Sequence, residues 1–474
     1  TACPSPRSHL RRRMRLAGRS GNCVCCLEEE HVKARIFVHP LLLFYSILIT
    51  QTFAAVIWVA PISLFAFVAA LRNRNPLFDA TDMFWLLASI FFVVTPCAML
   101  SEPEGSSWFS GGVLIRLYTG VEYAYDRYLL IQFFLGIYIS HFLSLLMFPS
   151  FVRDSGRSYK LRVDHRLTLP VVVILAVVTI QTCGGWSNFS SARYDRESEV
   201  ISILYLPLMG LYLASAILFL CGWKAKRANF LLLLILILTH VTMFNPLYTA
   251  RFHLILGWLP ILLILFPRSL LYRRFIGAAL VGMIIVMPIL SRTSRFGIAG
   301  LGMIDWRSLG FTTYTDLTQV LLELMVMVER YGHKFGESTL GIILFLVPRS
   351  LWVDKPKSIA LYIGEELFHK SQSGTSNLAA PIFGDFYLDF GIIGVVVGSA
   401  LTAILFRWLL RNLPSINNIP VLHYVVLASL PILYRGSIAA TIAMPFFTFV
   451  FVYLGGRLLQ VKFTFGTYAQ TTRS

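Results

Sequence analysis

Residues Tyr128–Phe148 read YLLIQFFLGIYISHFLSLLMF and contain no aspartate, glutamate, lysine or arginine. A helix needs about 17–25 predominantly apolar residues to cross the roughly 30 Å hydrocarbon layer of a bilayer. Lipid offers no hydrogen-bond partners to the backbone, so a spanning segment must satisfy its own backbone groups, as an α-helix does. Because the stretch lacks the alternation typical of a β-barrel strand, we predict a membrane-spanning helix here.

The rest of the chain has the same apolar character. Of its 474 residues, 56% are hydrophobic and 14% are charged, and the mean hydropathy is +0.69. A soluble chain is about 45–50% apolar and about 25% charged. Similar apolar windows recur at Val200–Cys221, Asn229–Phe244 and Ile438–Leu454. We therefore predict an all-α, polytopic membrane bundle of about 12 transmembrane helices.

The basic residues indicate how these helices are oriented. The formal net charge is +17, and most lysines and arginines lie in short loops between apolar stretches, as is typical of cytoplasmic loops. The charge therefore indicates contact with anionic membrane lipids. No nucleic-acid-binding motif accompanies it, so no nucleic-acid partner is expected.

The alternation of apolar stretches and basic loops divides the chain into segments. The first tail begins with Thr1 and contains Met14 as an alternative start. Either a native or an artefactual tail fits this pattern, and we assign it no function. The predicted segments are a basic cytoplasmic tail at 1–36, an N-terminal transmembrane bundle at 37–290, a large periplasmic loop at 291–385, C-terminal transmembrane helices at 386–456 and a cytoplasmic tail at 457–474.

The apolar stretch Phe37–Leu71 leads directly into the basic loop Arg72–Asn75. If both of its ends face the cytoplasm, the stretch crosses the membrane twice, as two short helices that turn near Gln51–Thr52. The alternative interpretation is one long helix that is broken at Pro61.

The large periplasmic loop is too apolar to be a disordered linker. Leu317–Val328 has helical periodicity, and Leu340–Val347 is an apolar run too short to span a membrane. We predict an amphipathic helix followed by an interfacial or re-entrant element. Together they would form a partly helical cap over the bundle.

The seven cysteines predict neither a disulfide framework nor a metal site. Cys97 and Cys183 lie in or at the end of apolar stretches, where cysteine usually serves packing. The cluster at 23–26 has no second pair at zinc-site spacing. Asp79 and Asp82 form a DxxD pattern, but they lie at the predicted inner boundary of the membrane.

Polar residues that are suited to ligand binding or catalysis are concentrated between residues 331 and 394. Arg349, Trp352 and Lys355 follow an apolar run and are flanked by two prolines. Arginine binds phosphate oxygens bidentately, lysine supplies a point charge, and indole offers an apolar face to a sugar ring. These residue types together suit an anionic headgroup that carries sugars.

Several motifs lie in this region. They are PRSLWVDKP at Pro348–Pro356, GTS at Gly374–Ser376, GDFYLDFG at Gly384–Gly391, and Gly394. The set resembles the Wzy-type family of bacterial O-antigen and oligosaccharide repeat-unit polymerases. Upstream positions that resemble the same family are Asn245, Pro246, Arg251, Gly257, Asp316 and Glu323. The specific resemblance covers roughly residues 244–406, and the N-terminal half matches only as a hydropathy profile.

The resemblance implies a metal-independent glycosyltransferase without a cofactor, at the periplasmic face of a bacterial cytoplasmic (inner) membrane. Such enzymes transfer a growing glycan from undecaprenyl pyrophosphate to the non-reducing end of another lipid-linked repeat unit. They thereby build O-antigen for lipopolysaccharide, or a related surface polysaccharide. The implied partners are undecaprenyl-pyrophosphate-linked glycans, membrane lipids and a chain-length regulator.

This reaction needs cations and a proton acceptor. Fixed cations stabilise the negative charge that develops on a departing lipid pyrophosphate, and a base accepts the proton of the acceptor hydroxyl. The expected substrate-binding residues are Arg251, Arg349 and Lys355, then Arg292, Arg295 and Arg435, with Trp352 against a sugar. The candidate bases are Glu337, which we prefer, Asp385 and His333.

Plainer interpretations exist for these residues. An arginine at the end of an apolar stretch also anchors its helix at the lipid headgroups, and we favour this interpretation for Arg292, Arg295 and Arg435. His333 also fits a solvated loop, and Gly391 and Gly394 fit close helix packing.

Two other functions remain as alternatives. An O-antigen ligase uses the same donor but transfers the glycan to the lipid A core. A lipid-linked oligosaccharide flippase or other transporter should line its bundle with buried charges, whereas most apolar stretches here carry no charge in the middle.

Overall fold

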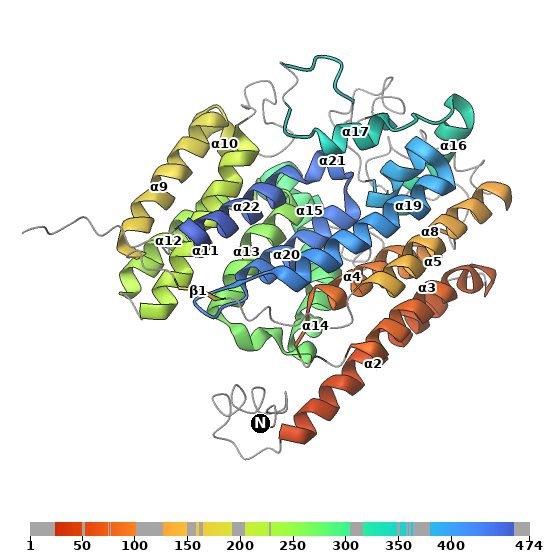
Figure 1. The fold of residues 1–474 in the computed structure, drawn as a ribbon, viewed down its shortest axis with the longest axis horizontal. Helices are drawn as coiled ribbons and strands as arrows, with labels where there is room; N and C mark the ends of the chain where they lie inside the picture. The colour runs from red at the N-terminus through yellow and green to blue at the C-terminus, as the bar shows by residue number, and fades with distance from the viewer. Residues whose placement is uncertain are drawn as a thin grey trace, which may run out of the picture.

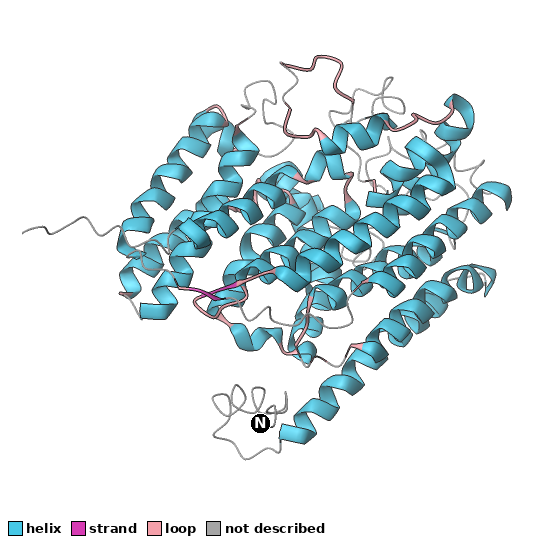
Figure 2. Ribbon diagram, viewed as in Figure 1, coloured by secondary structure: helices cyan, strands magenta, loops and turns pink. Residues whose placement is uncertain are grey.

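The chain is almost entirely helical in the part that the structure describes (Figure 1 and Figure 2), which confirms the predicted all-α class. The computed structural model describes residues 24–49, 53–73, 75, 77–100, 127–148, 158–160, 165–191, 204–226, 229–303, 316–347, 351–356, 359, 362–363 and 380–458. Strand β1 (Ser158–Tyr159) pairs in parallel with strand β2 (Ser415–Ile416).

The helices follow the predicted apolar stretches in order, except that the stretch Ile438–Leu454 is divided between two helices. The N-terminal ones are α2 (Val24–Ile49), α3 (Phe53–Arg72), α4 (Ala80–Ser89), the π-helical η1 (Ile90–Val94), α5 (Thr95–Leu100), α8 (Arg127–Met147), α9 (His165–Thr182), α10 (Gly185–Ser190), α11 (Tyr205–Lys226), α12 (Phe230–Met243) and α13 (Arg251–Leu265). The later ones are η3 (Pro267–Leu270), α14 (Tyr272–Val281), the π-helical η4 (Gly282–Val286), α15 (Met287–Phe296), η5 (Gly297–Met303), α16 (Asp316–Tyr331), α17 (Glu337–Ile343), α19 (Ile382–Asn412), α20 (Val421–Arg435), α21 (Ile438–Thr441) and α22 (Ala443–Leu458).

The first apolar stretch forms two helices, as predicted. Helix α2 ends at Ile49 and α3 begins at Phe53, so the break coincides with the expected turn. Pro61 lies inside α3, which makes the alternative of one long helix broken there wrong. Helix α2 begins at Val24, so its first turns lie within the segment predicted as a tail at 1–36. Its first turns are rich in glutamate, which favours helices but does not register as hydropathy.

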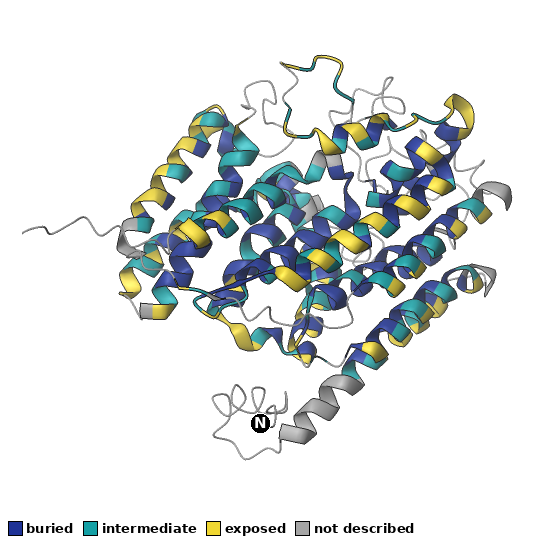
Figure 3. Cartoon of the chain, in the orientation of Figure 1, coloured by how far each residue is buried: buried dark blue, intermediate teal, exposed yellow. Residues whose placement is uncertain are grey.

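Several helices have the length and composition of membrane spans. Among the described residues, four helices are long enough and apolar enough to cross a membrane: Ala80–Ala98, Tyr205–Ala225, Tyr272–Ser294 and Ile382–Asn412. Shorter apolar helices accompany them. Large apolar side chains are exposed on several of these helices, among them Leu48, Leu238 and Ile393. Figure 3 shows exposed positions along the outer helices of the bundle. The exposed faces of these helices therefore suit hydrocarbon.

Among the described segments, β1 and α14 lie at one end of the bundle, and α10, α16, α17 and α21 lie at the other (Figure 1). At one end β1 pairs with β2, and Leu77 forms an isolated bridge with Leu271. At the other end, Ser338 and Ser437 both donate hydrogen bonds to Asp385. We call the end with Asp385 the site end and the end with Leu271 the opposite end.

Two helices extend into the segment predicted as a large loop at 291–385, one at each of its borders. Helix α15 continues to Phe296, and α19 already begins at Ile382. Arg292 and Arg295 therefore belong to the last turns of α15, and Asp385 belongs to the first turn of α19. Helices α16 and α17 match the predicted amphipathic helix and the short element after it.

Candidate functional site

The turn between α12 and α13 places Arg251 at a helix start. The Asn245 side chain accepts a hydrogen bond from the backbone N–H of Leu247 at 2.9 Å, and its carbonyl accepts from Thr249 at 2.9 Å. Asparagine is well suited to such a turn because its side chain mimics the backbone. Arg251 then begins α13, and its side chain is buried, with 7% exposed.

Glycine is required one and a half turns further along α13. A Cβ atom on Gly257 would lie 2.4 Å from the ring of Phe244, which is fully buried. This close contact holds the end of α12 against α13. The Asn-Pro, Arg and Gly positions that carry the upstream resemblance therefore build one turn and its packing.

Two arginines converge on one aromatic ring. The guanidinium carbon of Arg251 lies 5.4 Å from the centroid of the Phe252 ring, and that of Arg435 lies 4.8 Å from the same centroid. Arg435 is the last residue of α20 and is also buried. Cations at this distance are attracted by the ring quadrupole. Two of the predicted cations, distant in sequence, thus share one place in the fold.

Tyr434 helps to hold the end of α20 that carries Arg435. His141 of α8 donates from Nδ1 to the Ile137 carbonyl at 2.8 Å, so its Nε2 is the acceptor for the Tyr434 hydroxyl. Both side chains are buried. Tyr434 was not among the predicted site residues, although it directly precedes the candidate Arg435 in the sequence.

An apolar groove begins at Phe252. A cavity of about 210 Å³ lies between α4, α13, α14, η4, α15 and α20. Its walls are apolar side chains and glycine, among them Met83, Phe252, Leu259, Phe275, Met283 and Pro431. Ala278, which also lines it, is exposed at the surface of α14. The groove therefore extends from the Phe252 ring, which both arginines approach, to an exposed face of α14.

Asp385 and Asp389 lie one turn apart on α19 and are fully buried. Asp385 accepts hydrogen bonds from Ser338 Oγ at 3.2 Å, from Ser437 Oγ at 3.1 Å and from the backbone N–H of Ile438 at 2.9 Å. The three donors occupy its two oxygens. Asp385 therefore fixes the turn that follows Arg435 and begins α21.

Asp389 has the corresponding role at α17. It accepts from the backbone N–H of Ser338 at 2.9 Å, and from the backbone N–H and hydroxyl of Thr339, each at 2.6 Å. Carboxylates are stabilised at helix N-termini by such donors. Asp389 was not among the predicted site residues, although its spacing of four residues from Asp385 places both on one helix face.

Glu337 and His333 lie near these carboxylates. Glu337 is the exposed first residue of α17, directly before the two residues that Asp389 binds. His333 is half-buried against Gly391, and its Nδ1 atom has no hydrogen-bond partner among the described residues. Glu337 is thus exposed and His333 keeps one ring nitrogen without a partner, whereas both oxygens of Asp385 accept hydrogen bonds.

Lys355 closes a loop instead of projecting into solvent. Its ammonium group donates to the carbonyl oxygens of Phe345 at 2.9 Å and of Val347 at 2.8 Å. Trp352 in the same loop is partly buried, and Leu351 and Val353 beside it are each 80% exposed. Residues 351–356, which are the described part of the PRSLWVDKP motif, therefore form a loop that is bound to the segment directly after α17.

The other predicted cations are not all placed. Arg292 is partly buried on α15, beside Thr293, which donates to the Pro246 carbonyl. Arg349, the GTS motif and the side chain of Arg295 lie outside the described residues.

No family model, curated protein or solved structure matches the chain.

Proposed function

We propose that this protein is a membrane glycosyltransferase that polymerises oligosaccharide repeat units carried on undecaprenyl pyrophosphate. The observation that carries the proposal is the convergence of Arg251 and Arg435 on Phe252, where the apolar groove begins. Two guanidinium groups beside an apolar groove suit a molecule with an anionic head and a hydrocarbon tail. The resemblance to Wzy-type polymerases supplies the reaction.

In the proposed reaction, the acceptor hydroxyl oxygen forms a bond to the anomeric carbon of the donor sugar. The bond between that carbon and the phosphate oxygen breaks, and the departing pyrophosphate keeps the electron pair. Arg251 and Arg435 stabilise this charge, because fixed donors in a water-poor site need no reorganisation during the reaction.

The proton of the acceptor hydroxyl passes to a base at the site end. We assign this role to Glu337, because it is exposed and its helix is held in place by Asp389. His333 is the second candidate, through its unpartnered Nδ1 atom. Asp385 serves in this proposal to position the turn after Arg435.

The proposal also includes the location of the reaction. The bundle crosses the cytoplasmic membrane of a bacterium with about 12 helices, and the site end, with α16 and α17, faces the periplasm. Membrane lipids surround the bundle, and a chain-length regulator is the expected protein partner.

The test is a gel analysis of surface glycan in a strain that lacks this gene, complemented at matched protein levels. The intact gene should restore the polymer ladder. Arg251→Ala and Arg435→Ala should each leave a core with a single repeat unit, because a pyrophosphate-binding cation is lost. Arg411→Ala, an exposed arginine in the last turn of α19, is the matched control and should restore the ladder.

Other outcomes would favour other functions. Normal ladders from both alanine variants would show that the arginine pair is not the site. Accumulation of lipid-linked polymer with no glycan on the core in the null strain would identify a ligase. Accumulation of lipid-linked single units on the inner leaflet would identify a transporter.

A further inference from the structure

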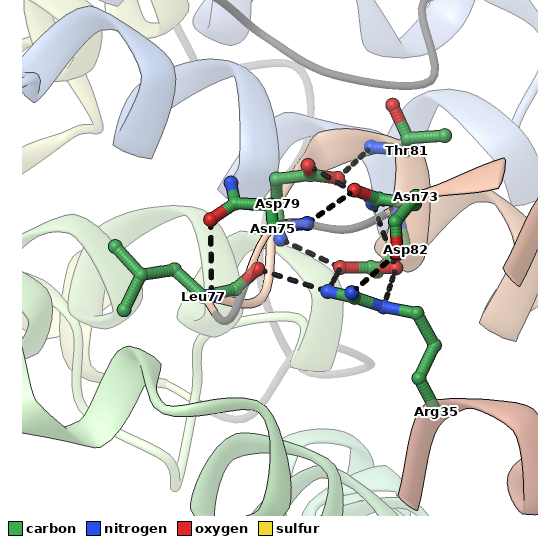
Figure 4. A network of polar contacts seen from close by, with 7 residues as sticks. All are labelled: Arg35, Asn73, Asn75, Leu77, Asp79, Thr81 and Asp82. Carbon is green, nitrogen blue, oxygen red and sulfur yellow. Dashed lines mark hydrogen bonds and ion pairs between the residues drawn. The ribbon is translucent and has the colours of Figure 1, made fainter. Parts of the chain in front are cut away.

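Arg35 lies at the centre of a buried polar network at the opposite end of the bundle (Figure 4). Its guanidinium group binds Asp82 through two hydrogen bonds, Nε to Oδ1 at 2.9 Å and Nη2 to Oδ2 at 2.8 Å. It also donates to the carbonyl oxygens of Asn73 at 2.8 Å and Leu77 at 3.1 Å. The residue is 1% exposed. Arg35 thus joins α2 to the segment between α3 and α4.

The network also fixes the start of α4. Asp79 accepts from the backbone N–H groups of Thr81 at 2.9 Å and Asp82 at 3.0 Å, and Asp82 accepts from that of Asp79 at 3.1 Å. The Asn73 amide donates to both carboxylates, at 3.1 and 3.2 Å. This reciprocal capping box leaves the first turn of α4 in one defined position.

The same network reaches α14. The guanidinium carbon of Arg35 lies 4.6 Å from the centroid of the Tyr272 ring. The backbone N–H of Phe78 donates to the Leu270 carbonyl at 2.8 Å, and the Phe78 ring stacks on that of Phe275 with centroids 4.1 Å apart. Tyr272 begins α14, and Phe275 lines the apolar groove.

Two walls of the groove therefore begin in this network. Met83 follows Asp82 directly and lines the groove from α4, while Phe275 lines it from α14. Replacing a buried ion pair by apolar residues often leaves stability unchanged, so stability alone does not require charges here. A fully satisfied polar network instead favours one arrangement of the elements that it joins.

We propose that Arg35 is a positioning residue for the apolar groove, which sets the spacing of α4 and α14 at the end remote from Arg251 and Arg435. The inference rests on the proposed function in one respect, namely that an isoprenoid chain occupies the groove. Through the position of these two helices, Arg35 affects how tightly the tail of that ligand is bound, and it does not affect binding of the pyrophosphate.

The test compares two soluble probes on the purified full-length protein in detergent. Farnesyl pyrophosphate has a head and an isoprenoid tail, and inorganic pyrophosphate has the head alone. The paired variant Arg35→Met/Asp82→Leu removes the ion pair as a whole, so neither of its two charges is left without the other. Asp79 stays in place and keeps its hydrogen bonds from Asn73 and from the backbone N–H groups of Thr81 and residue 82. It should bind farnesyl pyrophosphate roughly tenfold more weakly, the scale of a lost apolar fit, and bind inorganic pyrophosphate as the unchanged protein does.

Controls separate this inference from the proposed function. Arg251→Ala should weaken binding of both probes, and Arg274→Ala, an exposed change on α14 itself, should weaken neither. Equal binding of farnesyl pyrophosphate by the paired variant and the unchanged protein would overturn the positioning role of Arg35 and would leave the proposed function standing. Parallel loss of both probes in the paired variant would show a general structural defect and would also overturn it. If the unchanged protein binds neither probe, the proposed function fails.

Discussion

At the scale of single residues, Asp385 and Asp389 are buried carboxylates that bind helix starts. Each accepts hydrogen bonds only from hydroxyl and backbone N–H groups, and within the described residues neither contacts a basic side chain. A buried charge is costly unless donors surround it. The two aspartates therefore bind the starts of α17 and α21 to α19.

The change Asp389→Asn tests this role. An amide would turn N–H donors toward the N–H groups of Ser338 and Thr339, and leaving such groups unsatisfied costs about 1–3 kcal/mol. The free energy of unfolding, measured by SDS titration in mixed micelles, should fall by this amount. Asp354→Asn, in an exposed loop, is the control and should leave it unchanged. Equal stability of both variants would contradict the role of Asp389.

The arginine pair makes a second prediction at this scale. Arg251→Lys and Arg435→Lys keep the positive charge but lose the planar group that stacks on Phe252 and binds phosphate bidentately. The initial rate of transfer between purified lipid-linked repeat units should fall roughly 10–100-fold. Arg411→Lys should keep the full rate. If both pair variants are fully active, charge alone suffices and the proposed geometry is wrong.

At the scale of elements, α19 is broken at Phe390 and Gly391. Gly391 has φ +59° and ψ −143°, a conformation that only glycine adopts readily. The break leaves the carbonyls of Leu388 and Asp389 to accept from the backbone N–H groups of Lys334 and Phe335, each at 3.0 Å. One half of α19 therefore carries the buried aspartates and receives the loop before α17.

The change Gly391→Ala should disturb this junction. A Cβ atom there would lie 3.0 Å from Cε1 of His333, and the positive φ would be strained. We expect the free energy of unfolding to fall by about 1–3 kcal/mol. Gly277→Ala is the matched control, because a Cβ on that α14 residue meets nothing within 4 Å. A control variant as unstable as Gly391→Ala would show that the break is not special.

At the scale of the whole molecule, the polar chemistry is divided between the two ends. The site end carries the arginine pair and the two aspartates, and the opposite end carries the Arg35 network and β1 with β2. The apolar groove connects the two regions, since Phe252 and Phe275 both line it. The orientation of these ends across a membrane is a prediction from the basic loops.

Cysteine labelling tests the orientation. In a background without the native cysteines, Glu337→Cys and Val353→Cys should react with a membrane-impermeant maleimide in cells whose outer membrane alone is permeabilised. Lys160→Cys and Arg274→Cys, exposed at the opposite end, should react only after the inner membrane is disrupted. The reverse pattern would place the site end in the cytoplasm and exclude transfer at the periplasmic face.

The sequence by itself determined the helices, the turn between α2 and α3 and the amphipathic α16, because apolar content and periodicity act within a few turns of chain. It also selected Arg251 and Arg435 as separate candidates. Only the tertiary structure decided that they meet on Phe252, that Asp389 holds α17 and that Arg35 belongs to the bundle. Those contacts depend on which helix faces pack together, and residues 35 and 82, or 251 and 435, carry no local signal of that packing.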